Sequence, residues 1–234
     1  MKKQEVLNKM AKQVFVSCQA YDPNPHATIP DMVKMAIAAK MGGSTGYRVN
    51  HPDYVRAIRE EVGPEPIIIG IWKIMEPGND VYITTTMEAI DALVEAGSNV
   101  IALDCTDRVN AYGYKGYDLV PQILAKYPNI GIMADCSTVE EARLAKEAGV
   151  DIVASTMSGY TAYTVDRYAF DVDLDLLRGM KELGDVFVLA EGRIWTREDA
   201  INAFKAGADC LVVGTAITNP WKITERIVEA TKDI

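Results

Sequence analysis

Two side chains of the sequence could exchange a proton with a substrate, Lys73 and Glu191. Each ends a short apolar run, Lys73 after Ile-Ile-Ile-Gly-Ile-Trp and Glu191 after Val-Phe-Val-Leu-Ala. At the carboxyl end of a barrel strand, such a residue points into the reaction cavity. Burial or a nearby arginine would make the lysine a base near neutral pH, whereas a nearby glutamate would keep it charged. Which influence prevails stays open at this stage.

Each of the two residues also has a structural alternative. Lys73 could be the first solvated residue after a core strand, and Glu191 could be an ion-pair partner of Arg193 or Lys73. The polar residues after the expected strands favour a catalytic interpretation. Together they include a lysine, an arginine, two aspartates and a glutamate, which is more charged groups than are needed to end each strand in solvent. The further residues expected at this mouth are Gln19, Arg48, Asp104 with Thr106 and Arg108, Asp135, Ser158-Gly159-Tyr160, Gly192-Arg193 and Gly214-Thr215.

A phosphate site is indicated near the end of the chain. In many barrels the loops after strands seven and eight present glycine N–H groups and a helix N-terminus to a phosphate. Gly192-Arg193 and Val213-Gly214-Thr215 occupy those positions. A glycine after a strand is also a common turn, but the joint placement of both favours a phosphate-bearing ligand.

No metal or disulfide pattern is present in the sequence. The two histidines, His26 and His51, lie in early loops, and no histidine follows a later strand, so a catalytic metal is not expected. The four cysteines lack a C-x-x-C pair and are expected to be buried free thiols: Cys18, Cys105, Cys136 and Cys210.

The elements that must position these residues alternate strand and helix eight times, which predicts an α/β fold: a single (β/α)8, or TIM, barrel over residues 1–234. The expected strands are Val14–Ser17, Ser44–Arg48, Pro66–Lys73, Asn99–Leu103, Ile130–Ala134, Asp151–Ala154, Val186–Ala190 and Cys210–Val213. The expected helices are Ile29–Lys40, Asp53–Val62, Thr86–Ala96, Gly116–Lys126, Thr138–Gly149, Asp173–Leu183, Thr196–Ala206 and Pro220–Thr231.

Composition excludes several classes of partner. With 234 residues, 49% hydrophobic residues and a net charge of -9, the chain is of globular type, and its acidity argues against nucleic acid or an anionic membrane. No apolar run approaches the roughly 20 residues of a membrane span, and the N-terminal stretch is charged without an apolar core. A cytoplasmic location is therefore expected.

The motifs at the strand ends resemble those of the N-acetylmannosamine-6-phosphate 2-epimerase family, in the family's order over nearly the whole chain. They are Ser17-Cys-Gln-Ala20, Gly46-Tyr-Arg-Val-Asn50, Gly70-Ile-Trp-Lys73, Ile83-Thr-Thr-Thr86, Ala102-Leu-Asp-Cys-Thr106, Met133-Ala-Asp135 with Ser137-Thr138, Ser158-Gly-Tyr-Thr161, Ala190-Glu-Gly-Arg193 and Val213-Gly214 with Ala216-Ile-Thr218.

The resemblance implies an isomerase of sialic-acid catabolism that interconverts N-acetylmannosamine 6-phosphate and N-acetylglucosamine 6-phosphate without a metal or nucleotide. It also implies roles for individual residues. Lys73 would be the acid/base at C2, and Glu191 would orient or assist it. Gln19, Arg48 and Asp135 would hold the sugar and its amide, and the loops at Gly192 and Gly214 would hold the phosphate.

The chain departs from the family pattern at several places. Ile74-Met-Glu-Pro follows the lysine where the family usually has a basic residue and a tyrosine, and Thr215 and Asn219 stand where the family commonly has a glycine and an arginine. The loop after Gln19 and the segment after Arg108 also differ. Two other functions therefore stay open: a Schiff-base lyase acting on a phosphosugar through Lys73, and a sugar-phosphate binding protein without turnover. Barrels of this kind often pair through their outer helices, which leaves a homodimer as one option.

Overall fold

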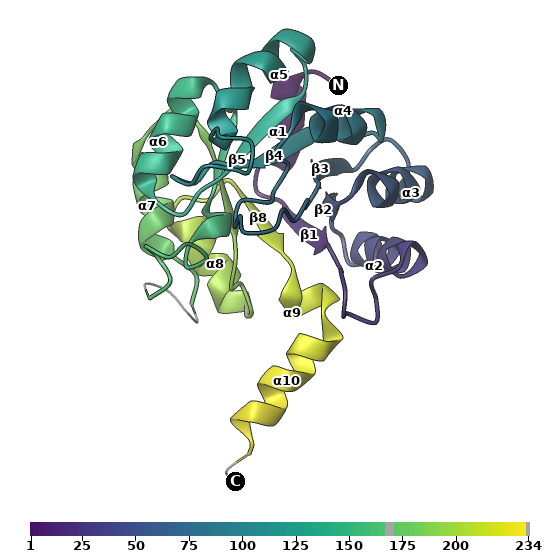
Figure 1. The fold of residues 1–234 in the computed structure, drawn as a ribbon. Helices are drawn as coiled ribbons and strands as arrows, with labels where there is room; N and C mark the ends of the chain where they lie inside the picture. Colours follow the sequence, from purple (N-terminus) through teal and green to yellow (C-terminus); the bar gives the residue numbers. More distant parts are fainter. Residues whose placement is uncertain (167–170, 233–234) are drawn as a thin grey trace.

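The computed structural model describes residues 1–166 and 171–232, and its strands form one closed parallel barrel, which confirms the predicted fold. Consecutive strands are neighbours and β8 pairs with β1. Figure 1 shows the ring of strands with helices around it. The strands are β1 (Val14–Cys18), β2 (Gly46–Asn50), β3 (Ile67–Ile71), β4 (Val100–Asp104), β5 (Gly131–Asp135), β6 (Ile152–Ala154), β7 (Phe187–Glu191) and β8 (Cys210–Val213).

The outer helices begin at the capping residues that the sequence offers. Thr138 and Glu141 form the predicted capping box, and Gly149 ends the same helix in a left-handed conformation. The helices after the first strand are α2 (Ile29–Met41), α3 (Pro52–Val62), α4 (Met87–Glu95), α5 (Val120–Lys126), α6 (Val139–Ala148), α7 (Leu174–Glu182), α8 (Arg197–Lys205), α9 (Thr215–Thr218) and α10 (Pro220–Ala230), with 3₁₀ turns η1 (Gly116–Leu119) and η2 (Ser155–Met157).

Three expected elements differ from the structure by two residues or more. The strand expected over Pro66–Lys73 ends at Ile71, two residues before Lys73. Strand β2 lies two residues later than expected, since it runs on to pair Asn50 with Ile71 of β3. The helix expected over Gly116–Lys126 is a 3₁₀ turn followed by α5, because Pro121 has no N–H to continue the hydrogen bonding of the preceding turn.

Alternate strand residues are buried in two separate layers. Ile67, Ile69 and Ile71 of β3 belong to a cluster that fills the barrel interior, whereas Ile68 packs with the helices outside. Gly70 also faces outward, where an added Cβ would lie 2.2 Å from Ser98 Oγ. Because successive side chains of a strand point to opposite faces, this alternation also fixes which residue beyond each strand enters the mouth.

The first helix, α1 (Lys3–Met10), was not expected from the sequence. Its Val6 and Met10 belong to the interior cluster, and they close the amino-terminal end of the barrel. Lys3 pairs with Asp151 at 2.9 Å, just before β6, and so ties the helix to that end. The floor is thereby sealed, and the opposite end is left for a ligand.

Helix α10 has a different environment from the other outer helices. It has no buried residue, and Figure 1 shows it in yellow, extending away from the barrel. Among the described residues, no helix is both long and apolar enough to cross a membrane. The four cysteines are buried and free, as expected.

Candidate active site

A cavity of about 480 Å³ opens at the carboxyl ends of the strands. Its volume lies in the range of pockets that hold a small metabolite. Most of the residues expected at this mouth line the same cavity: Gln19, Arg48, Lys73, Tyr160, Glu191, Gly192, Arg193, Gly214 and Thr215.

The strand register explains why these side chains meet. Lys73 lies two residues beyond inward-facing Ile71, and Glu191 lies two residues beyond inward-facing Leu189. Arg48 follows the same parity on β2, where its neighbours Tyr47 and Val49 face the outer layer. A period of two therefore turns all three side chains into the barrel, directly above its apolar filling.

A buried arginine joins two carboxylates at the base of the cavity. The Arg48 side chain is 1% exposed and binds Asp135 through two bonds, Nη1–Oδ1 at 2.9 Å and Nη2–Oδ2 at 2.6 Å. The same Nη1 donates to Glu191 Oε2 at 2.6 Å. The two carboxylates raise the pKa of Arg48 further, despite its burial. Arg48 therefore stays charged and holds Glu191 in place.

Lys73 is held by its backbone and has a free ammonium group. Its N–H donates to Asn50 Oδ1 at 2.9 Å, and it forms an antiparallel bridge with Ile83. The Nζ atom lies 5.1 Å from the centre of the Tyr21 ring. Within residues 1–166 and 171–232, no hydrogen bond or ion pair involves this Nζ. The amine is thus available to a ligand.

The surroundings lower the pKa of Lys73 from 10.5 to about 8. Burial contributes most and the positive charge of Arg48 adds to it, whereas Glu191 and Asp135 act in the opposite direction. The question left open by the sequence is thereby answered, because desolvation and arginine outweigh the two carboxylates. At pH 7 about one molecule in ten carries the neutral amine, which is the form that can accept a proton.

Glu191 reaches the cavity with one carboxylate oxygen engaged. Its Oε2 accepts from Arg48 and, at 3.0 Å, from Thr156 Oγ1. Its Oε1 accepts no hydrogen bond from the described part of the chain. Burial raises the pKa of Glu191, and the charge of Arg48 offsets part of that rise. The free oxygen can therefore contact a ligand or share a proton with it.

The loops after β7 and β8 have the backbone features expected of a phosphate site. Gly192 has φ +113°, which a residue with a side chain rarely adopts. Thr215 begins α9, whose first N–H groups have no partner within the helix, and the Gly214 carbonyl accepts from Ile217 and Thr218.

Arg193 lines the cavity, but its guanidinium is occupied. It donates to Ser158 O and Asp171 O, both at 2.6 Å, and to Ser158 Oγ at 3.2 Å. Arg193 therefore fastens the segment after β6 to the loop after β7.

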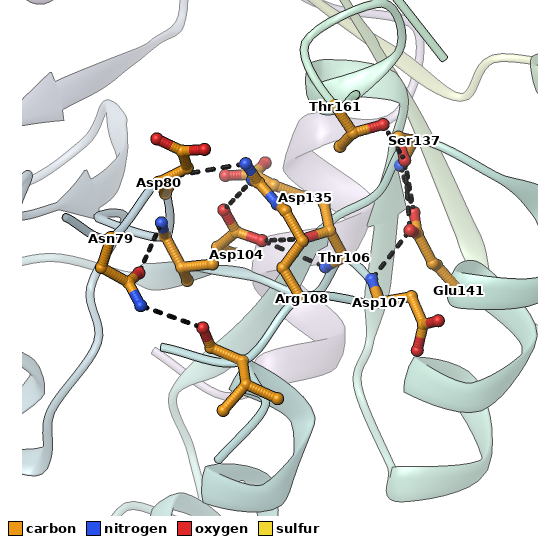
Figure 2. A network of polar contacts seen from close by, with 12 residues as sticks. Asn79, Asp80, Asp104, Thr106, Asp107, Arg108, Asp135, Ser137, Glu141 and Thr161 are labelled. Carbon is orange, nitrogen blue, oxygen red and sulfur yellow. Dashed lines mark hydrogen bonds and ion pairs between the residues drawn. The ribbon is translucent and has the colours of Figure 1, made fainter. Parts of the chain in front are cut away.

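Several residues expected at the mouth do not line the cavity. Asp135 is fully buried behind Arg48, and the N–H of Gly159 donates to Thr164 Oγ1 at 3.1 Å. Asp104 is occupied within its own loop: Oδ1 accepts from Thr106 Oγ1 at 2.6 Å and Oδ2 from Arg108 at 2.8 Å. Figure 2 shows this cluster beside Asp135.

A second polar group in Figure 2 ties the neighbouring loops together through Glu141. Its carboxylate accepts from the N–H groups of Ser137 and Asp107, at 2.6 and 2.8 Å, and from Tyr163 OH. These residues follow β4, β5 and β6. One buried carboxylate therefore fixes three loops on one side of the mouth.

Other residues of the cavity were not expected from the sequence. Thr156 lies two residues beyond inward-facing Ala154, so strand parity could have found it. Tyr21 and Tyr82 also line the cavity, but they lie in loops, where no periodicity points to them. In the described part of the chain, no group of three or more His, Cys, Asp or Glu side chains is placed to hold a metal ion.

Comparisons with known proteins give one consistent result. A family model described as "Putative N-acetylmannosamine-6-phosphate epimerase" matches residues 32–233. A protein of Shouchella clausii named "Putative N-acetylmannosamine-6-phosphate 2-epimerase" is 42% identical over 225 residues, 96% of this chain and 98% of that protein. One of the same name from Caldanaerobacter subterraneus subsp. tengcongensis is 38% identical over 229 residues, 98% of this chain and 95% of that protein. The solved structure of the N-acetylmannosamine-6-phosphate 2-epimerase from Clostridium perfringens is similar with a TM-score of 0.89 and 38% identity, covering 96% of this chain and 95% of that one.

Proposed function

The chain belongs to the N-acetylmannosamine-6-phosphate epimerase family, as its motifs indicated, and we propose that it interconverts N-acetylmannosamine 6-phosphate and N-acetylglucosamine 6-phosphate by inverting C2 without a cofactor. The observation that carries the proposal is Lys73, a lysine with a pKa of about 8 whose free amine faces the cavity across from Glu191.

Lys73 is the acid/base of this reaction. In the ring-opened sugar, C2 lies beside the C1 aldehyde, so its proton is acidic. The neutral amine of Lys73 takes that proton, and the C2–H electron pair moves into the C1–C2 bond while the carbonyl oxygen becomes an enolate oxygen. Delivery of a proton from solvent to the opposite face of C2, with protonated Lys73 releasing its proton to solvent, completes the inversion, whereas return of the proton from Lys73 to the same face regenerates the substrate.

The charged groups around Lys73 stabilise the enolate. Once protonated, Lys73 is a cation beside the developing oxyanion, and Arg48 adds a fixed positive charge. Glu191 orients the substrate or shares a proton with it through Oε1. Gln19 lines the cavity, with Nε2 donating to Ser17 Oγ at 2.8 Å, and its amide oxygen is suited to a sugar hydroxyl or amide. Asp135 acts through Arg48.

The phosphate belongs at the loops after β7 and β8. Gly192, Gly214 and Thr215 offer backbone N–H groups there, and the absence of a side chain at the two glycines lets an anion approach closely. Arg193 supports this end by holding the segment after β6, and Gly159 lies in that segment.

Deuterium exchange tests the proposal. We expect the protein in D2O to incorporate deuterium at C2 of N-acetylmannosamine 6-phosphate and to form N-acetylglucosamine 6-phosphate, both followed by NMR. A panel of other hexosamine phosphates defines the substrate range. Absence of both exchange and product would refute the proposal and leave a sugar-phosphate binding protein.

A Schiff-base lyase is distinguished by chemical trapping. A lysine with a lowered pKa is also what an aldolase requires. Borohydride reduction in the presence of substrate would then add mass at Lys73. We expect no added mass, because the epimerase proposal involves no covalent intermediate.

We also infer that two copies of the chain pair through outer helices. Helix α10 supports this inference, because Ile227 and Val228 are 61% and 53% exposed and the helix has no buried residue. We expect a dimer in sedimentation experiments and a monomer for Ile227→Glu; a monomeric unmodified protein would contradict the inference. A single domain over residues 1–234 and a cytoplasmic location stay predictions.

A further inference from the structure

Four cationic side chains line the cavity within the described residues: Arg48, Lys73, Arg193 and Lys222. The first three already have assignments. Arg48 is bound by Asp135 and Glu191, Lys73 faces the reacting end, and Arg193 donates all its close hydrogen bonds to the segment after β6. Of these four side chains, only Lys222 lacks a role in the site, and it lies at the end formed by the last loops, where a dianionic phosphate would need a cation.

Lys222 occupies the first turn of α10, at the edge of that end. Its backbone N–H donates to the side chain of Asn219, the N-cap residue, at 3.1 Å. Asn219, Trp221 and Lys222 line the same cavity as Thr215. The turn that carries the lysine is thus fixed against the loop that offers backbone N–H groups.

The ammonium of Lys222 is held only by exposed partners. It lies 4.7 Å from the centre of the Trp221 ring and 2.7 Å from Glu225 Oε2. The side chains of Lys222 and Glu225 are 43% and 53% exposed, and such surface pairs contribute little to stability. Because a lysine has a flexible four-carbon stem, its ammonium can leave Glu225 for a dianion in the cavity.

We propose that Lys222 is the cation that binds the phosphate of the substrate and makes the site selective for phosphorylated over free sugars. This inference rests on the proposed function for the identity of the sugar. It assigns to α10 a role in substrate recognition. The strand-end motifs and the glycine loops supply no free cation for the phosphate, and α10 does. No sequence motif points to Lys222, since it lies eight positions beyond Gly214, inside a helix.

The test compares binding of N-acetylglucosamine 6-phosphate and N-acetylglucosamine by calorimetry. We expect Lys222→Gln to weaken binding of the phosphorylated sugar by about tenfold, since one charge-assisted bond at a partly exposed site is lost. Binding of the free sugar should not change. Lys222→Arg should keep most of the affinity, and Glu225→Gln should keep or strengthen it, because a competitor of the phosphate is removed.

Lys34→Gln is the matched control. Lys34 forms an i, i+3 ion pair with Asp31 on α2 and does not line the cavity, so its loss should change neither affinity. If the free sugar binds too weakly to measure, the test is the affinity for the phosphorylated sugar alone, which should fall in Lys222→Gln and not in Lys34→Gln.

Unchanged affinity of Lys222→Gln for the phosphorylated sugar would overturn the inference, as would an equal loss for both sugars. The proposed function fails separately. An unmodified protein that binds the phosphorylated sugar through Lys222 but incorporates no deuterium at C2 would refute the epimerase and leave the phosphate ligand standing. Failure of the unmodified protein to bind the phosphorylated sugar at all would refute both.

Discussion

Replacing Glu191 with glutamine should shift the pH dependence of catalysis. The substitution keeps the shape of the side chain, and its amide oxygen can still accept from Arg48, but one negative charge is removed. The negative charge of Glu191 raises the pKa of Lys73. It also neutralises part of the positive charge of Arg48, and that positive charge lowers the pKa of Lys73. Both consequences of the substitution therefore move the pKa of Lys73 below about 8.

The size of the shift follows from the spacing of the charges. Glu191 acts on Lys73 through space and not as an ion pair in contact, so at an effective dielectric constant of about 20 their interaction is below the roughly 4 kcal/mol of charges about 4 Å apart, and about 2 kcal/mol for charges about 8 Å apart. The smaller value corresponds to about 1.5 pH units. Since the cavity is open to solvent, we expect a shift of about one unit.

The assay is the pH profile of kcat/KM for C2 exchange, which reports the pKa values of the free enzyme. The acid limb should have its inflection near pH 8 in the unmodified protein and near pH 7 in Glu191→Gln, whatever happens to the maximal rate. Glu76→Gln is the control, because Glu76 lies on the loop after Lys73 but does not line the cavity. An unchanged inflection, or one moved to higher pH, would show that the charge of Glu191 does not raise the pKa of Lys73.

Two further predictions concern stability. Asp135→Asn should lower the free energy of unfolding by about 3 kcal/mol in urea titrations, because it leaves buried Arg48 with only Glu191 as counter-charge. Asp91→Asn breaks a surface pair and should lower the free energy of unfolding by less than about 1 kcal/mol, so equal losses would contradict the role given to Asp135. Lys73→Met should raise Tm below pH 8 by several degrees. The pKa of Lys73 is 10.5 in the unfolded chain and about 8 in the folded one, so burying the charged lysine lowers the free energy of unfolding by at most about 3 kcal/mol, and the substitution removes that loss. The Tm increase should shrink between those two pH values, because the unmodified chain becomes more stable as the pH rises through them. A Tm increase that grows with pH would contradict the lowered pKa of Lys73.

The barrel could be predicted from the sequence because its strands are continuous apolar runs between capped helices. The triple isoleucine at 67–69 has both faces buried, and the capping box at Thr138 starts α6 as expected. Helix α1 escaped detection because only Val6, Leu7 and Met10 carry its apolar face within a charged segment. Its stability comes from sealing the barrel floor, which is a long-range contact.

The candidate site was predictable in its members but not in its pairings. Strand parity turns Arg48, Asp135 and Glu191 inward, yet nothing local says that the arginine is shared by the two carboxylates. Asp135 was expected to contact the ligand, but it lies behind Arg48. Arg193 was also expected at the ligand, but carbonyl groups occupy its guanidinium. These pairings depend on which side chains are closest across the closed ring, which a linear pattern does not encode.

Deuterium exchange at C2 by Lys73→Met shows whether the Lys73 amine removes the C2 proton. We expect this variant to bind N-acetylglucosamine 6-phosphate with nearly unchanged affinity while exchange falls by at least about a hundredfold, since the amine that accepts the proton is gone. Exchange retained at the unmodified rate by a folded, ligand-binding Lys73→Met protein would show that another group removes the proton.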